Sequence, residues 1–253
     1  MRKSPIVALG LTAALGFGGV AIAQEDTSPG HTLQVTVSPA KAGKKKKPKN
    51  VKVGLDIQNN KASGTTAKQI VVKFPKTIKM NPKNFKTCSE ATLDPSTGEG
   101  PDACPKGSKL GSGTAGAVVN PGSATPAPLN FKNTFFVGGK KQLNIYLEQT
   151  NGDVRKLLIG KIGKAGGKYG QQLTIDIPED LQQPAPQVYS ALTDIKTSLK
   201  GTAGKGKKKH GFFESRGCTG GLYDFQTQIS YAPNPNPPAA DKSEANDSVD
   251  CKK

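Results

Sequence analysis

Residues 88–115 read CSEATLDPSTGEGPDACPKGSKLGSGTA and carry the first two of the four cysteines. Cys88 and Cys104 lie sixteen positions apart around a loop rich in Gly, Pro, Ser and Asp, and apolar residues return from Ala117 onward. A loop of this composition between two cysteines is typical of a disulfide-linked corner between two β-strands. The stretch does not resemble a catalytic motif.

Cys218 and Cys251 bring the number of cysteines to four, and an even number indicates two disulfide bonds in an oxidising compartment. Four cysteines allow three pairings. We favour Cys88–Cys104 and Cys218–Cys251, because each pair closes the shorter loop. A zinc site is the alternative, but the chain has no CxxC motif and its two histidines are remote from the cysteines in sequence.

The chain begins with the pattern of a secretory signal peptide. A positive pair at Arg2 and Lys3 precedes an apolar run over residues 6–20, and the A-x-A tripeptide at residues 21–23 is typical of a cleavage site. This run is shorter than the about 20 apolar residues that a transmembrane helix requires. We therefore expect removal of residues 1–23 and a secreted or extracellular protein without a transmembrane anchor, either free or associated with the cell envelope.

Alternating apolar and polar residues predict β-strands through the rest of the chain. The clearest strand has apolar residues at every second position: Val51, Val53, Leu55 and Ile57. Similar alternation recurs along the chain between turn signals such as Asn-Gly-Asp at residues 151–153. Residues 188–199 fit either a helix or a strand, and we favour a strand because the neighbouring segments are strands.

These patterns predict an all-β fold, an antiparallel β-sandwich of the immunoglobulin-like or jelly-roll-like kind. Residues 24–253 are expected to form a single domain, since no internal repeat divides them. Basic loops at residues 40–50 and 201–210 interrupt the strand pattern. Residues 232–253 are mostly turn-like, with a short strand expected only near Val249 and Cys251.

The chain has 36 basic and 19 acidic residues, a formal net charge of +17 at pH 7. Such a surplus attracts anionic polymers, and it also keeps a protein dispersed in solution. Most of the basic residues are lysines, which act as hydrated point charges rather than shaped phosphate ligands. The candidate polyanion contacts are the lysines of the two basic loops: Lys44, Lys45, Lys46, Lys47, Lys49, Lys205, Lys207, Lys208 and Lys209.

No catalytic or metal-binding motif stands out. The G-x-S-x-G nucleophile motif is absent, and we interpret Gly111-Ser112-Gly113 as part of a turn. His31 and His210 lie in predicted loops, where a single histidine is ordinarily solvated. The acidic residues of the segment 241–250 lack the spacing of a calcium-binding loop and are interpreted as a loop tip. The sequence therefore predicts no catalytic residue, no metal site and no cofactor.

Four short motifs follow one another along the chain: FPK at residues 74–76, NPKNFKTC at 81–88, CPKGSKLGSGTA at 104–115 and GCTGG at 217–221. Together they resemble the pattern shared by a family of exported β-rich proteins of high-GC Gram-positive bacteria. The resemblance covers most of the chain after residue 23. It implies an exported bacterial β-protein, but it assigns no activity and transfers no functional residue.

Two functional hypotheses follow. The first is an exported, non-enzymatic binding or structural module whose lysine loops are attracted to anionic cell-envelope polymers or to another surface protein. The lysine loops lack interleaved aromatic residues, so we do not expect sequence-specific nucleic-acid binding. The second is a secreted hydrolase or carbohydrate-binding protein whose site only the fold assembles. We favour the first hypothesis because no catalytic motif is present.

Overall fold

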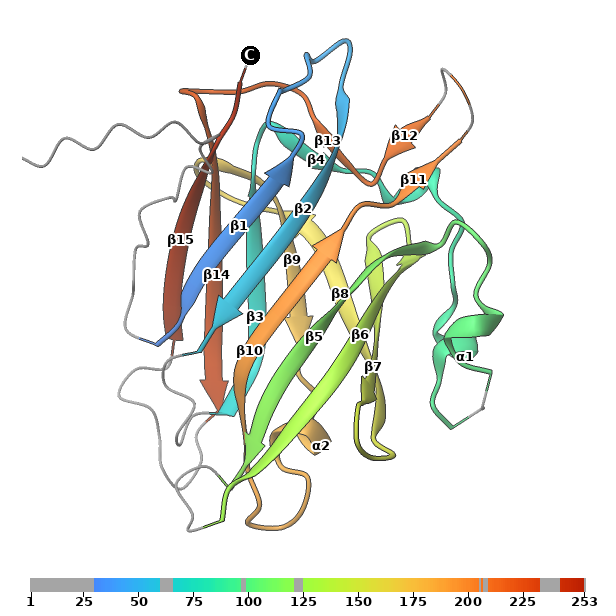
Figure 1. The fold of residues 1–253 in the computed structure, drawn as a ribbon, viewed down its shortest axis with the longest axis vertical. Helices are drawn as coiled ribbons and strands as arrows, with labels where there is room; N and C mark the ends of the chain where they lie inside the picture. The colour runs from blue at the N-terminus through green and yellow to red at the C-terminus, as the bar shows by residue number, and fades with distance from the viewer. Residues whose placement is uncertain are drawn as a thin grey trace, which may run out of the picture.

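A computed structural model describes residues 30–59, 66–96, 99–120, 125–204, 206, 209–232 and 242–252 (Figure 1). The expected signal peptide, residues 1–23, lies outside these described residues, as do Lys205, Lys207 and Lys208. None of the helices within the described ranges is long and apolar enough to cross a membrane.

The described chain is mainly β-structure. The strands are β1 (Thr32–Ser38), β2 (Lys49–Gln58), β3 (Thr66–Pro75), β4 (Ile78–Met80), β5 (Lys109–Val119), β6 (Ala127–Gly139), β7 (Gln142–Gln149), β8 (Arg155–Lys164), β9 (Tyr169–Asp176), β10 (Ser190–Leu199), β11 (Thr202–Ala203), β12 (His210–Gly211), β13 (Phe213–Ser215), β14 (Leu222–Ala232) and β15 (Lys242–Asp250). The helical turns are η1 (Pro82–Asn84), α1 (Glu90–Leu93), η2 (Pro101–Ala103) and α2 (Glu179–Gln182).

Thirteen of the described strands form one antiparallel sheet in the order β15-β14-β3-β9-β8-β7-β6-β5-β10-β2-β13-β4, with β1 also paired to β2. The sheet curls until β1 lies beside β15, so that β2, β10, β5 and β6 face β3, β9 and β8 (Figure 1). These pairings confirm the predicted all-β, antiparallel fold with two facing layers, and they show that both layers belong to one continuous sheet. The ambiguous segment 188–199 forms strand β10, as expected.

Side chains close the seam between β1 and β15, since no backbone ladder joins these two strands in the described residues. The Asp247 carboxyl group accepts a hydrogen bond from the backbone N–H of Val35 at 2.5 Å. Beyond β1, the Ala42 N–H donates to the Lys252 carbonyl at 2.7 Å, and the Lys252 N–H donates to the Ala40 carbonyl at 3.0 Å. The first and last described segments are therefore joined by a side-chain hydrogen bond within the seam and by backbone hydrogen bonds just beyond it.

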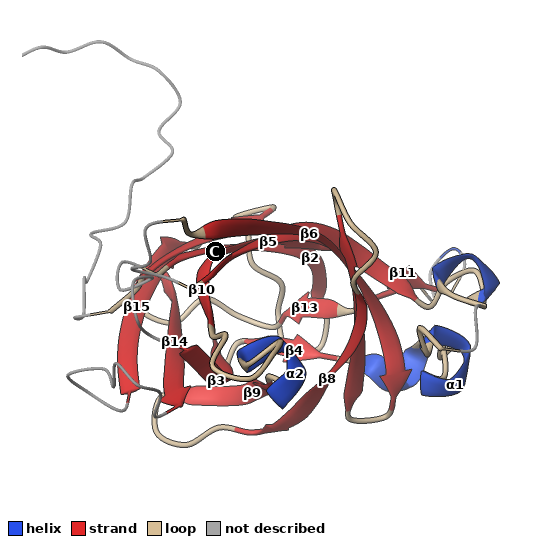
Figure 2. Cartoon of the chain, turned by 90° about the horizontal axis from the view of Figure 1, so that it is seen from below, coloured by secondary structure: helices blue, strands red, loops and turns tan. Residues whose placement is uncertain are grey.

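Aromatic side chains fill the interior at one end of the sheet. The ring of Phe213 lies 5.4 Å from that of Phe74 and 4.9 Å from that of Phe212, and Phe74 also meets Phe225 at 5.7 Å. Figure 2 shows β13 and β4 inside the outline of the curled sheet, while α2 lies across the opposite end. Burial of each such ring removes a large apolar surface from water and stabilises the fold by roughly 1.5–3 kcal/mol.

The disulfides pair Cys88 with Cys104 and Cys218 with Cys251, which confirms both predicted bonds. On the chain-entropy model, loops of these lengths stabilise the folded state by about 3–4 kcal/mol each. Two disulfides are consistent with an oxidising compartment.

The corner that begins at Cys88 lies outside the main core. Leu93 of α1 packs with Cys88 against Phe136 and Tyr146, which face outward from β6 and β7. The side-chain amide of Asn144 donates to the Cys88 carbonyl at 2.9 Å. The corner therefore covers the outer face of this hairpin, and it connects β4 to β5 rather than organising the sheet.

The predicted turn at Gly111-Ser112-Gly113 is wrong, because these residues lie within β5. A Cβ atom at Gly111 would lie 2.1 Å from the Ser198 carbonyl oxygen, and one at Gly113 would lie 2.0 Å from the Lys196 carbonyl oxygen. Only glycine allows β10 to approach β5 so closely. The glycine-rich sequence therefore reflects strand contact rather than a turn.

The predicted acidic loop tip is also wrong, because most of it forms the nine-residue strand β15. The buried positions of this strand hold Ser243, Ala245 and Asp247. Because its inward positions hold small and polar residues, β15 lacks the alternation of apolar and polar residues by which a strand is predicted from sequence. Asp241 lies outside the described residues.

Candidate functional site

Antiparallel topology gathers basic side chains at one end of the sheet. The loop after β1, the turn between β3 and β4, and the β6–β7 and β8–β9 hairpins all lie at the end where β1, β3, β6 and β8 finish. We call this the basic end; it lies at the top of Figure 1. Two surface hollows occur there, and lysines line both.

The first basic hollow has a volume of about 700 Å³ and lies between the loop after β1 and the segment after β13. Six cationic side chains line it: Lys41, Lys44, Lys45, Lys47, Lys49 and Arg216. No acidic side chain contributes to its lining in the described part of the chain. Cys218 also contributes, so the second disulfide anchors one wall.

The loop that carries these lysines has a defined backbone. Lys44 and Lys47 exchange two backbone hydrogen bonds, each 2.9 Å long, and the Gly43 N–H donates to the Ser215 hydroxyl at 3.3 Å. A Cβ atom at Gly43 would lie 2.4 Å from both the Lys49 nitrogen and the Ser215 carbonyl oxygen, so only glycine fits there. The lysine side chains thus project from a fixed turn rather than from a loose tip.

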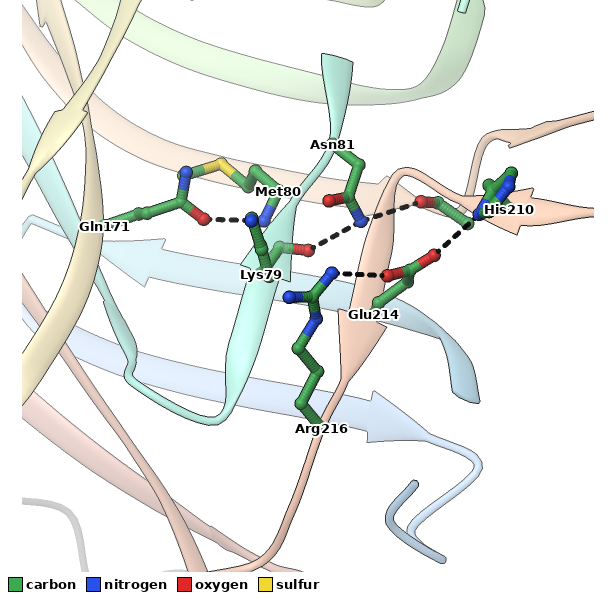
Figure 3. A network of polar contacts seen from close by, with 8 residues as sticks. Lys79, Met80, Asn81, Gln171, His210, Glu214 and Arg216 are labelled. Carbon is green, nitrogen blue, oxygen red and sulfur yellow. Dashed lines mark hydrogen bonds and ion pairs between the residues drawn. The ribbon is translucent and has the colours of Figure 1, made fainter. Parts of the chain in front are cut away.

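Arg216 is held by the buried carboxylate of Glu214, as Figure 3 shows. Its Nη2 lies 3.1 Å from Glu214 Oε2, and His210 Nδ1 lies 3.3 Å from Glu214 Oε1. Only 4% of the Glu214 side chain is exposed. The carboxylate therefore orients Arg216, and it uses one oxygen for each of its two partners.

The second basic hollow, of about 380 Å³, lies on the other side of β13. Its lysines are Lys79, Lys83, Lys140, Lys141 and Lys164. In the strand register, Lys79 of β4 lies opposite Glu214 of β13. The Gln171 side chain accepts a hydrogen bond from the Met80 N–H at 2.8 Å, and this bond ties β4 to β9 (Figure 3). The two hollows are therefore neighbours across the β2–β13–β4 ribbon.

The lysines of the two hollows differ from several other basic side chains in their ion pairing. Lys168, in the β8–β9 hairpin, lies 3.9 Å from Asp224. Away from the basic end, Lys196 pairs with Asp56 at 2.8 Å, Arg155 lies 3.8 Å from Glu148, and Lys156 pairs with Asp180. In contrast, no ion pair within the described residues reaches the lysines of either hollow. The positive charge of the ten lysines in the two hollows is thus not compensated by an ion pair in the described residues.

The structure brings together part of the predicted set of lysines. Lys44, Lys45, Lys47 and Lys49 line the first basic hollow, whereas Lys46 is exposed beside it. Lys209 is exposed and lines neither hollow, and the other three lysines of its loop lie outside the described residues. Arg216 and the whole second hollow were not predicted. The signal for the latter was weak: lysines at several separate turns, such as Lys140 and Lys141.

The prediction of a solvated His31 is wrong. Its side chain is fully buried, with Nδ1 2.6 Å from the Ser243 hydroxyl and Nε2 2.8 Å from the Thr227 hydroxyl. Burial lowers the pKa of His31 from 6.5 to about 4. A neutral imidazole satisfies both hydroxyls, since one ring nitrogen donates and the other accepts. His31 is therefore part of the seam beside β15. The His210 side chain is half-exposed and contacts the buried Glu214 carboxylate from the solvent side.

The described residues contain no group of three or more His, Cys, Asp or Glu side chains placed to hold a metal ion.

The fold and its hollows define an all-β, disulfide-linked protein with a cationic end. Comparison with protein-family models, with curated proteins and with solved structures finds no match for the chain. The resemblance to exported proteins of high-GC Gram-positive bacteria therefore stays a prediction.

Proposed function

We propose that this protein is an exported, non-enzymatic binding module that holds anionic polymers of the cell envelope at its basic end. The observation that carries the proposal is the first basic hollow, in which five lysines and Arg216 surround one space, and no acidic side chain among the described residues lines it. Uncompensated like charges repel one another, and an anionic polymer relieves this repulsion when it displaces counterions. The two disulfides suit a protein that works in an oxidising compartment outside the cytoplasm.

The composition of the hollows favours recognition of charge rather than of a particular sugar or base. Ten of the eleven cations are lysines, whose ammonium groups are mobile and hydrated, and Arg216 has one terminal nitrogen committed to Glu214. Neither lining includes an aromatic side chain in the described chain. We therefore expect similar affinity for phosphate and sulfate polymers of equal charge density.

A salt series tests the proposal. Retention of the mature protein would be measured on a poly(glycerol phosphate) polymer of the teichoic-acid type, on heparin and on DNA. The expected result is binding to all three, with steep loss as salt rises. In the variant Lys44→Gln/Lys47→Gln/Lys49→Gln, the slope of log K against log salt should become shallower by about 2, since each lost phosphate contact contributes roughly 0.7–0.9.

The matched control removes the same charge elsewhere. Lys68, Lys132 and Lys242 are exposed, outside both hollows and without an ion pair in the described structure. The triple glutamine variant at these positions should keep the wild-type slope. An equal loss of slope in the control would show that net charge acts without a site. No retention on any of the three polymers would contradict the proposed function.

A further inference from the structure

The interior of the curled sheet is filled unevenly along its length. Towards the basic end it contains the phenylalanine cluster, whereas towards α2 the inward positions of β3 and β5 hold small residues such as Ala67 and Ala115. A cavity of about 120 Å³ remains there, and we call it the apolar cavity. Most of the side chains that line it are aliphatic or aromatic, among them Phe131, Leu147 and Ile195. The small residues thus leave a space that their larger neighbours do not fill.

The apolar cavity offers few hydrogen-bond partners to a water molecule. Among the described residues, the polar side chains that line it are those of Asn133 and Ser190. The Ser190 hydroxyl already donates to the Leu181 carbonyl, and Asn133 Oδ1 is buried too deeply for a water molecule to reach it. A buried water requires about two to four polar partners, so this space favours an apolar occupant.

Apolar side chains stay partly exposed where the cavity meets the α2 end of the sheet. Leu181 of α2 lines the cavity, as do Leu129 near the start of β6, Leu192 near the start of β10 and Ile177 just after β9. All four are only partly buried, although they pack against the core. Figure 2 shows α2 lying across this end of the sheet. The packing at this end therefore leaves apolar surface uncovered.

We infer that the apolar cavity binds a neutral hydrocarbon group of about the size of a benzene ring. An apolar cavity of roughly 150 Å³ stays dry and accepts benzene, and the present space is only slightly smaller. The guest supplies the dispersion contacts that the uncovered side chains lack. No charged side chain lines the cavity in the described residues, which excludes an ionised group because its charge would be buried without a partner. This site is separate from the basic end and does not depend on the proposed function.

Such a hydrocarbon group can be a free molecule or the end of an alkyl chain whose polar head stays in solvent. Benzene and hexyl β-glucoside are the probes for these two sources, since the glucose head is neutral and too large to enter. Binding to the mature protein would be followed by NMR, through the methyl signals of Leu147 and Ile195. Leu93 lies in the separate cluster below the disulfide corner and provides the reference signal.

We expect benzene to shift the methyl signals of Leu147 and Ile195 and to leave those of Leu93 unchanged. A shift of the same signals by hexyl glucoside assigns alkyl-chain ends as ligands, whereas a response to benzene alone assigns the free molecule. The inference is overturned if neither probe shifts the cavity signals up to its solubility limit. It is also overturned if the Leu93 signals move as much as the cavity signals.

Variants that fill the cavity make the test specific. Ala115→Leu adds three carbon atoms from β5 and should weaken benzene binding about tenfold or more, because leucine occupies space that the ring requires. Ala67→Leu fills the cavity from β3 and serves as the test if the first variant does not fold. Ala91→Leu adds the same side chain at an exposed position of α1 and should keep the wild-type affinity. Unchanged affinity in either folded cavity variant would contradict binding at this site.

Discussion

His31 shows how one buried side chain makes the stability of the protein depend on pH. Its two ring nitrogens bond the hydroxyls of Ser243 and Thr227, and burial holds its pKa at about 4 instead of 6.5. Between these values the unfolded chain binds a proton at His31 and the folded chain does not. The stabilisation is therefore complete above pH 6.5 and is lost as the pH falls towards 4. The full effect is roughly 3 kcal/mol.

We expect the free energy of unfolding to fall by about 2 kcal/mol between pH 7 and pH 5 because of His31 alone. Urea unfolding at several pH values would measure it. The variant His31→Gln keeps hydrogen-bonding groups but does not titrate, so its pH dependence over this range should be much weaker. Asp56 and Asp176, whose pKa values lie below the usual 3.8, stay ionised throughout the range and do not confuse the result. The same slope in both proteins would contradict this account.

At the scale of elements, β15 is held by side-chain contacts in addition to its ladder with β14. Its pairing covers Lys242–Asp250, and the disulfide at Cys251 fixes its end to the segment before β14. On its other edge, Asp247 accepts the hydrogen bond from the Val35 N–H of β1. The carboxyl group thus satisfies an edge donor that would otherwise lie unpaired at the seam.

Replacing Asp247 should loosen this seam. Asp247→Ala leaves the Val35 N–H without its acceptor, and we expect a loss of about 2–3 kcal/mol in the free energy of unfolding. Asp247→Asn retains an acceptor oxygen and should cost less. Glu244→Ala, on the exposed face of the same strand, is the control and should change stability by less than about 0.5 kcal/mol. If the alanine variants at both positions are equally stable, the seam does not depend on Asp247.

The molecule as a whole is electrically polar. The two basic hollows lie at one end on either side of β13, while ion pairs such as Lys196–Asp56 balance charge away from that end. Under the proposed function, one polymer chain would occupy both neighbouring hollows at once. Such double contact raises the apparent affinity of a long chain without any new interaction.

The proposed function therefore predicts a dependence on polymer length. Long heparin chains should bind the wild-type protein more tightly, per sulfate group, than short fragments that reach only one hollow. The variant Lys79→Gln/Lys140→Gln/Lys164→Gln empties the second hollow of three charges and should reduce this advantage. The control variant at Lys68, Lys132 and Lys242 should keep it. Affinity per sulfate that is independent of chain length in the wild type would show that the hollows act separately.

The sequence alone determined those features that depend on neighbours along the chain. Alternation at Val51–Ile57 predicted β2, the Asn-Gly-Asp turn predicted the β7–β8 hairpin, and loop length predicted both disulfide pairs. The period of two along a strand and the short reach of a turn are local properties, so residue order is sufficient to read them. The positive charge of the loop at residues 40–50 was visible for the same reason.

Only the tertiary structure decided how distant segments meet. The three-residue strand β13 inserts between β2 and β4, and this brings Arg216 to the lysine loop and Lys79 to Glu214. Curling of the sheet brings Ala67 of β3 and Ala115 of β5 to one cavity, although each residue looks unremarkable in its own strand. Asp247 and His31 were likewise hidden, because small and polar inward residues disguise the pattern of β15. The order of strands that no short turn connects, and the register between them, arise from packing between residues far apart in sequence, which local patterns do not reveal.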